Sequence, residues 1–147
     1  MIKIIVVGKM NQKYLNQGIA FYQKQIPVKL EWIEVSDEAS KQGINIEGER
    51  ILGKIKDSDI VIALAIKGKM FDSEGFAQLI DEKTTYYQGD LVFVIGGSYG
   101  LSEQVIQRSN DQISFSKMTF PHQMMRLILM EQIYRGYMIL KNHPYHK

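Results

Sequence analysis

The chain has 147 residues, of which 45% are hydrophobic and 23% are charged, and its formal net charge is +2. These values are ordinary for one globular domain with a sizeable core, so they exclude disordered and fibrous architectures. Because the sequence contains no cysteine, disulfides, thiolate nucleophiles and cysteine-based metal sites are excluded as well.

Strand-like and helix-like segments alternate along the whole chain. In chain order we predict a strand at 2–7, a helix at 11–25, a strand at 30–35, a loop at 36–44, a helix at 46–56, a strand at 60–66, a helix at 73–82, a strand at 91–95, a helix at 103–108, a strand at 113–115 and a helix at 121–140. Segments 60–66 and 91–95 are continuously apolar, which is typical of parallel strands buried on both faces. The glutamates in 30–35 indicate an edge strand. This order predicts an α/β fold with a mostly parallel sheet flanked by helices, in a single domain covering residues 1–147.

No targeting or membrane segment is recognisable in the sequence. The apolar run at residues 4–7 is shorter than a signal-peptide core of about 7–15 residues. Nothing approaches the roughly 18 apolar residues of a membrane span. We therefore expect a cytoplasmic protein, and its small positive charge permits binding to nucleic acid without indicating it.

Three of the predicted strand ends carry residues able to contact a ligand. They are residues 64–68, where Lys67-Gly68-Lys69 is expected to end the third strand, the turn Gly96-Gly97-x-x-Gly100, and residues 116–119. The glycine turn matches neither a dinucleotide fingerprint nor a P-loop, and taken alone a tight strand-to-helix turn explains it better. Adjacent glycines also let backbone groups approach a ligand. Since ligands bind beyond the carboxyl ends of open parallel sheets, we predict the site where these ends meet.

The last predicted helix places one arginine on an apolar face. Residues 124–140 number 17, and 12 of them are large and apolar. At about 100° per residue, Glu131, Gln132 and Arg135 share a polar stripe, and Arg126 falls opposite it. A guanidinium is rarely buried without a partner, so Arg126 indicates either a structural ion pair or a residue directed at a substrate. The wide apolar surface predicts that this helix packs on the sheet and on a second copy of the chain.

The carboxyl-terminal tail, residues 142–147, is too polar to add to a core. Its His143-x-x-His146 pair lacks a third ligand at plausible spacing, so we predict no metal site. Terminal segments commonly fray. This one directly follows a helix that must be well anchored, which makes its titratable side chains candidates for function.

Four segments together carry a specific resemblance to a known family. They are an opening strand ending in Val-Gly-Lys, the turn Ile95-Gly96-Gly97-x-x-Gly100-Leu101, the run from Ser114 through Pro121-His122 to Arg126, and the terminal Tyr145-His146-Lys147. On these motifs, spread over almost the whole chain, the sequence resembles the RlmH family, the bacterial pseudouridine N3-methyltransferases of 23S rRNA in the SPOUT superfamily.

The resemblance implies a SPOUT-type fold with a carboxyl-terminal trefoil knot, a homodimer packed through the last helix, and S-adenosylmethionine held in the knot. The implied cofactor contacts are Leu64, Gly96, Phe115, Ser116, Lys117, Met118, Thr119 and Phe120. The implied substrate is a pseudouridine of 23S rRNA. We expect it on assembled ribosomes, because a net charge of only +2 makes binding to naked RNA weak.

Three residues are candidates for catalysis. The N3 imide of pseudouridine must lose its proton, and we expect His146 or Tyr145 to guide that proton away. We expect Arg126 to stabilise the resulting negative charge or to hold a phosphate. If the last helix forms the dimer surface, the tail is a candidate to complete the partner's site.

Two alternatives remain open. A SPOUT enzyme acting on tRNA or another RNA base would use the same cofactor pocket. A non-catalytic RNA- or nucleotide-binding module would keep the glycine turn but would not need Tyr145 and His146. The resemblance departs in one place, because the segment between Val35 and Glu47 is shorter than in many relatives, and this affects RNA docking more than chemistry.

Overall fold

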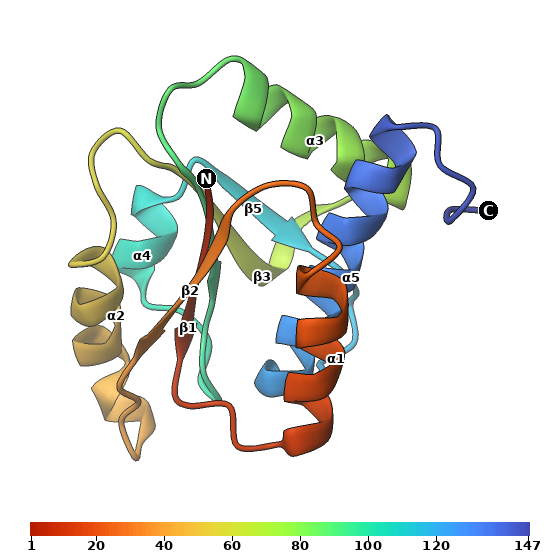
Figure 1. Ribbon diagram of the computed structural model, residues 1–147. Helices are drawn as coiled ribbons and strands as arrows, with labels where there is room; N and C mark the ends of the chain where they lie inside the picture. The colour runs from red at the N-terminus through yellow and green to blue at the C-terminus, as the bar shows by residue number, and fades with distance from the viewer.

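The computed structural model describes residues 1–147 and has three layers, with helices on both faces of a five-stranded sheet (Figure 1). The strands are β1 (Ile2–Val7), β2 (Leu30–Val35), β3 (Ile60–Met70), β4 (Leu91–Ile95) and β5 (Asp111–Ser114). The helices are α1 (Lys13–Gln23), α2 (Ile44–Leu52), α3 (Ser73–Thr85), α4 (Glu103–Arg108) and α5 (His122–Leu140), and a 3-10 turn, η1 (Lys41–Gly43), precedes α2. The predicted α/β class and the order of the elements are confirmed.

Every strand pair in the sheet is parallel, and the strand order is β2-β1-β4-β3-β5. The strand β2 lies at an edge, as its glutamates predicted, and β4 lies in the middle between β1 and β3. Helices α1, α3 and α5 cover one face, while α2 and α4 cover the other (Figure 1). The carboxyl ends of all five strands therefore point to the same end of the sheet, where a ligand site is expected.

Alternate residues of each central strand feed two separate apolar cores. In β1, Ile2, Ile4 and Val6 pack with α1, α3 and α5, whereas Ile5 and Val7 pack with α2 and α4. Successive side chains of a strand point to opposite faces, so a strand covered on both sides must be apolar throughout. This is why the continuous apolar runs predicted the buried strands correctly.

The end of β3 was predicted wrongly. The strand continues through Lys67-Gly68-Lys69 to Met70, and beyond Leu64 it pairs with β5 alone, across a shift of register. A Cβ at Gly68 would lie 2.7 Å from backbone atoms of Gln112 and Ile113. Here glycine allows the backbone of β5 to approach closely, and so it continues the pairing instead of ending the strand.

Smaller boundaries also differ from prediction. Residues 36–44 are not a loop throughout, because they contain η1 and the first residue of α2. Pro121 is the N-cap of α5, with extended ψ of 134°, and does not lie within the first helical turn. Ser102 caps α4 as expected, since its side chain accepts a hydrogen bond from the Val105 amide.

Candidate active site

A cavity of about 1080 Å³ lies at the carboxyl ends of β3 and β4, beside the segment that joins β5 to α5. All three strand ends singled out in the sequence contribute to its wall. Seven of the eight predicted cofactor residues line it: Leu64, Gly96, Phe115, Ser116, Met118, Thr119 and Phe120. Lys117 does not line the cavity and is exposed between two residues that do.

The glycine turn after β4 forms one wall of this cavity through its backbone. A Cβ on Gly96 would lie 2.6 Å from the carbonyl oxygen of Gly100. Because that oxygen belongs to the backbone, no side chain can move to relieve the clash. The Gly100 amide donates to the Gly97 carbonyl at 3.1 Å, and Gly100 has a φ of +81°, where a side chain is strained. The turn therefore folds back on itself, and its backbone forms this part of the cavity wall.

The opposite wall, residues 114–118, is held by its own hydrogen bonds. The Ser114 hydroxyl donates to the Ser116 carbonyl at 2.9 Å, and the Ser116 hydroxyl accepts from the Met118 amide at 3.0 Å. Phe115 packs edge-on against Phe76, with ring centres 5.7 Å apart. These contacts within the chain give the wall a defined shape.

Arg126 is buried and occupies a place that the helical pattern could not specify. Only 1% of its surface is exposed, and its Nη2 donates to the carbonyl oxygens of Val7 at 2.9 Å and Gly8 at 3.0 Å. Its Nε has no partner, and burial lowers the pKa of the guanidinium while Glu34 opposes that shift. Within the chain, backbone carbonyls at the end of β1 take the place of the carboxylate expected for a structural ion pair.

His122 lies one turn before Arg126 and lines the cavity. Its Nδ1 is buried without a hydrogen-bond partner. Burial lowers the pKa of His122, and the nearby charge of Arg126 lowers it further, against smaller opposing effects of Asp37 and Glu47. A neutral imidazole whose two nitrogens make no hydrogen bond within the chain therefore lies in the cavity wall, although the sequence analysis did not assign His122 to the site.

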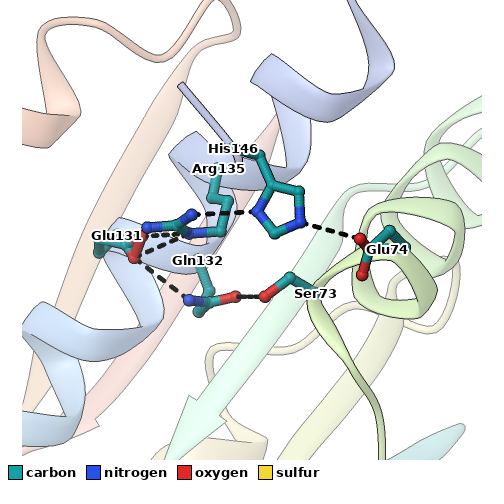
Figure 2. Close-up of polar contacts among 6 residues, drawn as sticks. All are labelled: Ser73, Glu74, Glu131, Gln132, Arg135 and His146. Atoms are coloured by element: carbon teal, nitrogen blue, oxygen red, sulfur yellow. Dashed lines mark hydrogen bonds and ion pairs between the residues drawn. The ribbon is translucent and has the colours of Figure 1, made fainter. Parts of the chain in front are cut away.

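The tail is held by a polar network that links it to α3 and α5 (Figure 2). His146 Nε2 lies 2.9 Å from Glu74 Oε1, and its Nδ1 lies 3.0 Å from Arg135 Nη1. Arg135 Nε in turn donates to Glu131 at 2.6 Å. The network continues from Glu131 through the Gln132 amide to the Ser73 hydroxyl (Figure 2).

These contacts decide which nitrogen of His146 carries the proton. A guanidinium can only donate, so Nδ1 accepts from Arg135, and Nε2 carries the proton that it donates to Glu74. That hydrogen bond holds the pKa of Glu74 below its usual range. Both nitrogens of His146 are therefore occupied, and the ring must leave Arg135 before it can accept another proton.

Tyr145 is anchored beside the same network by its ring. It meets Tyr134 edge-on at 4.6 Å between ring centres, and the Arg135 guanidinium lies 4.7 Å from the centre of its ring. Burial, followed by a hydrogen bond with Tyr22, raises the pKa of Tyr145 to about 12. Its hydroxyl therefore stays protonated at neutral pH and can donate a hydrogen bond there.

Within one chain the tail and the cofactor cavity are separate. His146 lines a second cavity, of about 520 Å³, with residues of α3 and α5. The two cavities share only Ile113, Ser114 and Phe115. The structure therefore gathers the predicted cofactor residues in one place and the predicted tail residues in another, with Arg126 lining neither.

Sequence reasoning identified the polar stripe on α5 without finding its purpose. Glu131, Gln132 and Arg135 hold the tail, together with Ser73 and Glu74 at the start of α3. The sequence indicated that the stripe has partners, because polar residues on an otherwise apolar helix need them. It did not indicate that α3 supplies those partners, since nothing in the sequence brings Glu74 next to His146, which is 72 positions away.

The fold and the matched sequence together define the class of protein. A family model described as "Predicted SPOUT methyltransferase" matches residues 1–146. A solved structure of a probable methylase family protein from Haemophilus influenzae superposes with a TM-score of 0.59 at 13% identity, covering 99% of this chain and 70% of that one. At that identity the superposition supports the fold alone.

Curated relatives narrow the class further. Proteins named ribosomal RNA large subunit methyltransferase H from Exiguobacterium sp. and Acholeplasma laidlawii are 54% and 53% identical, each over 99% of both chains. The chain therefore belongs to the RlmH family of SPOUT methyltransferases, as its motifs predicted. The match to Exiguobacterium extends over 157 residues and that to Acholeplasma over 146, so relatives differ in length by about the size of a loop.

SPOUT methyltransferases use S-adenosylmethionine, and the cavity fits such a ligand. Its wall is about half hydrophobic, with 12 apolar residues among 23, which suits an adenosine ring system. Gly96 is buried and its backbone lies close against that of Gly100, so the turn is a tightly packed part of the cavity wall. The unpartnered Nδ1 of His122 supplies a polar atom that a ligand could satisfy.

Proposed function

We propose that this protein methylates N3 of a pseudouridine in 23S rRNA, acting on assembled ribosomes in the cytoplasm as a homodimer with one domain per subunit. The observation that carries the proposal is the cavity at the carboxyl ends of β3 and β4, which seven of the eight residues implied by the RlmH resemblance line together. The full-length relatives, which are named ribosomal RNA large subunit methyltransferases, supply the substrate class.

When bound, S-adenosylmethionine supplies an electrophilic methyl group. Leu64, the glycine turn at Gly96 and the wall Phe115–Phe120 would hold the cofactor, with Lys117 at the edge of that wall. Much of the rate should come from positioning, because the methyl group and the nucleophile must be in line at close range. The rigid turn and the hydrogen-bonded wall supply that positioning.

The tail supplies the candidate groups for proton transfer. N3 of the base must lose a proton, and the neutral imidazole of His146 accepts it once its Nδ1 leaves Arg135. Tyr145, which stays protonated, donates a hydrogen bond to a base oxygen once its hydroxyl leaves Tyr22. Removing the His146 imidazole should then lower the rate by about 10²–10⁴-fold.

Arg126 has a more restricted role than that of an exposed arginine that stabilises charge on the RNA. Because its guanidinium is buried and donates to Val7 and Gly8, contact with RNA would require it to leave those carbonyls. We propose that it acts by fixing the start of α5 against the end of β1. Its Nε and Nη1 make no hydrogen bond within the chain and remain the atoms through which it can stabilise negative charge directly.

The separation of the tail from the cofactor cavity favours a site shared between two subunits. Mixing a Gly96→Val protomer with a His146→Ala protomer tests this, because each alone lacks one half of the site. Recovery of roughly a quarter to a half of wild-type activity in the mixture would support sharing. Activity no higher than that of the two parents would contradict it.

The finer topology also belongs to this proposal. We propose that the chain is knotted around the cavity, as the resemblance implies, because β5, the following wall and the glycine turn all meet there. An experimental structure whose backbone straightens when both ends are pulled apart would contradict the knot.

The direct test is methyl transfer to assembled ribosomes from a bacterium that lacks its own RlmH. Labelled S-adenosylmethionine should transfer about one methyl group per ribosome, and nucleoside digests should place it on N3 of pseudouridine. Label on another base would favour a different SPOUT specificity. Cofactor binding without transfer to any RNA would favour the non-catalytic RNA-binding alternative.

A further inference from the structure

The strand β3 is longer than the sheet that contains it. Its neighbour β4 pairs with it only as far as Leu64, and the last residues of β3 pair with β5 on one side alone. Four of these residues, Ile66, Lys67, Lys69 and Met70, are exposed and form what we call the β3 ledge. A strand edge left open in this way is usually blunted by charge or covered by a partner.

The two lysines of the β3 ledge have no carboxylate partner. Only two lysines of the molecule do, because Lys3 pairs with Asp90 at 3.1 Å and Lys83 with Asp111 at 3.3 Å. Lys69 instead lies 5.2 Å from the ring centre of Phe71. The ledge therefore combines two unneutralised ammonium groups with the exposed apolar side chains of Ile66 and Met70, which are 56% and 51% exposed.

The position of the β3 ledge is fixed by the backbone. Gly68, between the two lysines, lies so close to β5 that a Cβ would meet the backbone of Gln112 and Ile113 at 2.7 Å. Ile66 and Lys67 also line the cofactor cavity. The two ammonium groups are therefore carried by a rigid element that reaches from the mouth of the cavity outward.

We propose that the β3 ledge binds the phosphodiester backbone of the RNA whose base enters the cofactor cavity, with Lys67 and Lys69 contacting phosphates. The inference rests on the proposed function. RNA suits the surface better than an acidic protein segment does, because lysines contact phosphates as point charges while exposed apolar side chains contact ribose and base faces. A net charge of only +2 gives the whole molecule little attraction for RNA, so a local pair of unpaired cations has a large effect.

The test compares a Lys67→Gln/Lys69→Gln variant with a Lys29→Gln/Lys54→Gln control that removes the same charge. Lys29 and Lys54 are also exposed, and they lie before β2 and after α2, away from the carboxyl ends of the sheet. Binding to a fluorescent RNA hairpin of about 30 nucleotides is measured by anisotropy from 50 to 200 mM KCl. Methyl transfer to ribosomal subunits is measured over the same salt range, and cofactor affinity by calorimetry.

Losing two phosphate contacts should reduce the slope of log affinity against log salt by about 1.5. At 50 mM KCl the β3 ledge variant should bind RNA roughly tenfold more weakly, and its KM for subunits should rise similarly. The control should change the salt slope of RNA binding by no more than about 0.5. Because Lys67 lines the cofactor cavity, cofactor affinity is measured in Lys69→Gln alone, whose residue does not line it, and should stay within about twofold of wild type.

Three results would overturn the inference. An RNA slope equal to that of the control would show that the lysines do not meet phosphates. A parallel fall in cofactor affinity would assign them to the cofactor, and loss of subunit binding with unchanged RNA binding would assign them to a ribosomal protein. The hairpin assay does not depend on methyl transfer, so absence of catalysis would count against the proposed function and leave this inference separately tested.

Discussion

Replacing Gly96 by alanine should disturb the cofactor cavity more than any other single methyl group. The added Cβ would lie 2.6 Å from the Gly100 carbonyl oxygen and 2.7 Å from its carbonyl carbon, both backbone atoms. Such a clash forces the turn to move, and overpacking of this kind costs about 1–3 kcal/mol. For a chain of this size that corresponds to a fall in Tm of roughly 2–12 °C.

The same displacement should weaken cofactor binding. If the strain is relieved in the free protein but must be restored for the ligand to bind, about 1–3 kcal/mol corresponds to a loss of roughly 5–150-fold in affinity. Calorimetric titration with S-adenosylmethionine measures this loss directly. Thermal unfolding of the same samples measures the accompanying loss of stability.

Two matched glycines serve as controls. Gly53 has an ordinary helical φ of −65°, and a Cβ there meets its nearest atoms at 3.5 Å, so Gly53→Ala should be neutral or stabilise by about 0.4–1 kcal/mol. Gly100→Ala meets nothing within 4 Å but has a φ of +81°, so it reports backbone strain without a clash. If Gly96→Ala bound the cofactor and unfolded like Gly53→Ala, the assignment of the glycine turn to the cavity wall would be refuted.

Three further outcomes are expected. Arg126→Met should lower the free energy of unfolding by about 1–3 kcal/mol, because the buried Val7 carbonyl and the partly buried Gly8 carbonyl lose their donor. An unchanged midpoint of urea unfolding would contradict the structural role. Burial lowers the pKa of His122 in the folded chain from its ordinary value of 6.5. Below pH 6.5 the unfolded chain therefore binds a proton at His122 more readily than the folded chain does, and the free energy of unfolding should fall as the pH drops. His122→Gln should flatten that fall between about pH 7 and 5, and identical pH profiles for the variant and the wild type would contradict this reasoning. Arg135→Gln should speed amide hydrogen exchange in the tail by roughly tenfold, whereas Lys141→Gln, which changes an unpaired lysine nearby, should not.

The sequence predicted the elements whose patterns are local. Runs such as 91–95, apolar at every position, could only be strands buried on both faces, and the structure agrees with those bounds. The end of β3 could not be predicted, because Lys67-Gly68-Lys69 has the composition of a loop. Its strand conformation depends on β5, which is more than 40 residues away in the chain.

The site was predictable where backbone geometry determines it and less so where side chains meet across the fold. The glycines at the end of β4 and residues 116–119 before α5 indicated the cavity without any knowledge of strand pairing. Arg126 was recognised as unusual, but its partners at the end of β1 are 118 and 119 residues away. The Glu74 contact with the tail is of the same kind, and no periodicity within α3 reveals it.

The central place of β4 has a consequence for how the chain folds during synthesis. Since β4 separates β1 from β3, the 90 residues made before it contain three strands, of which β1 and β2 can pair with each other while β3 has no sheet neighbour yet. Pairing across such sequence distances raises contact order and slows folding, and unpaired strand edges invite association between nascent chains. Folding of the sheet should therefore wait until residues 91–95 have left the ribosome. A chain truncated before them should aggregate instead of forming a stable half.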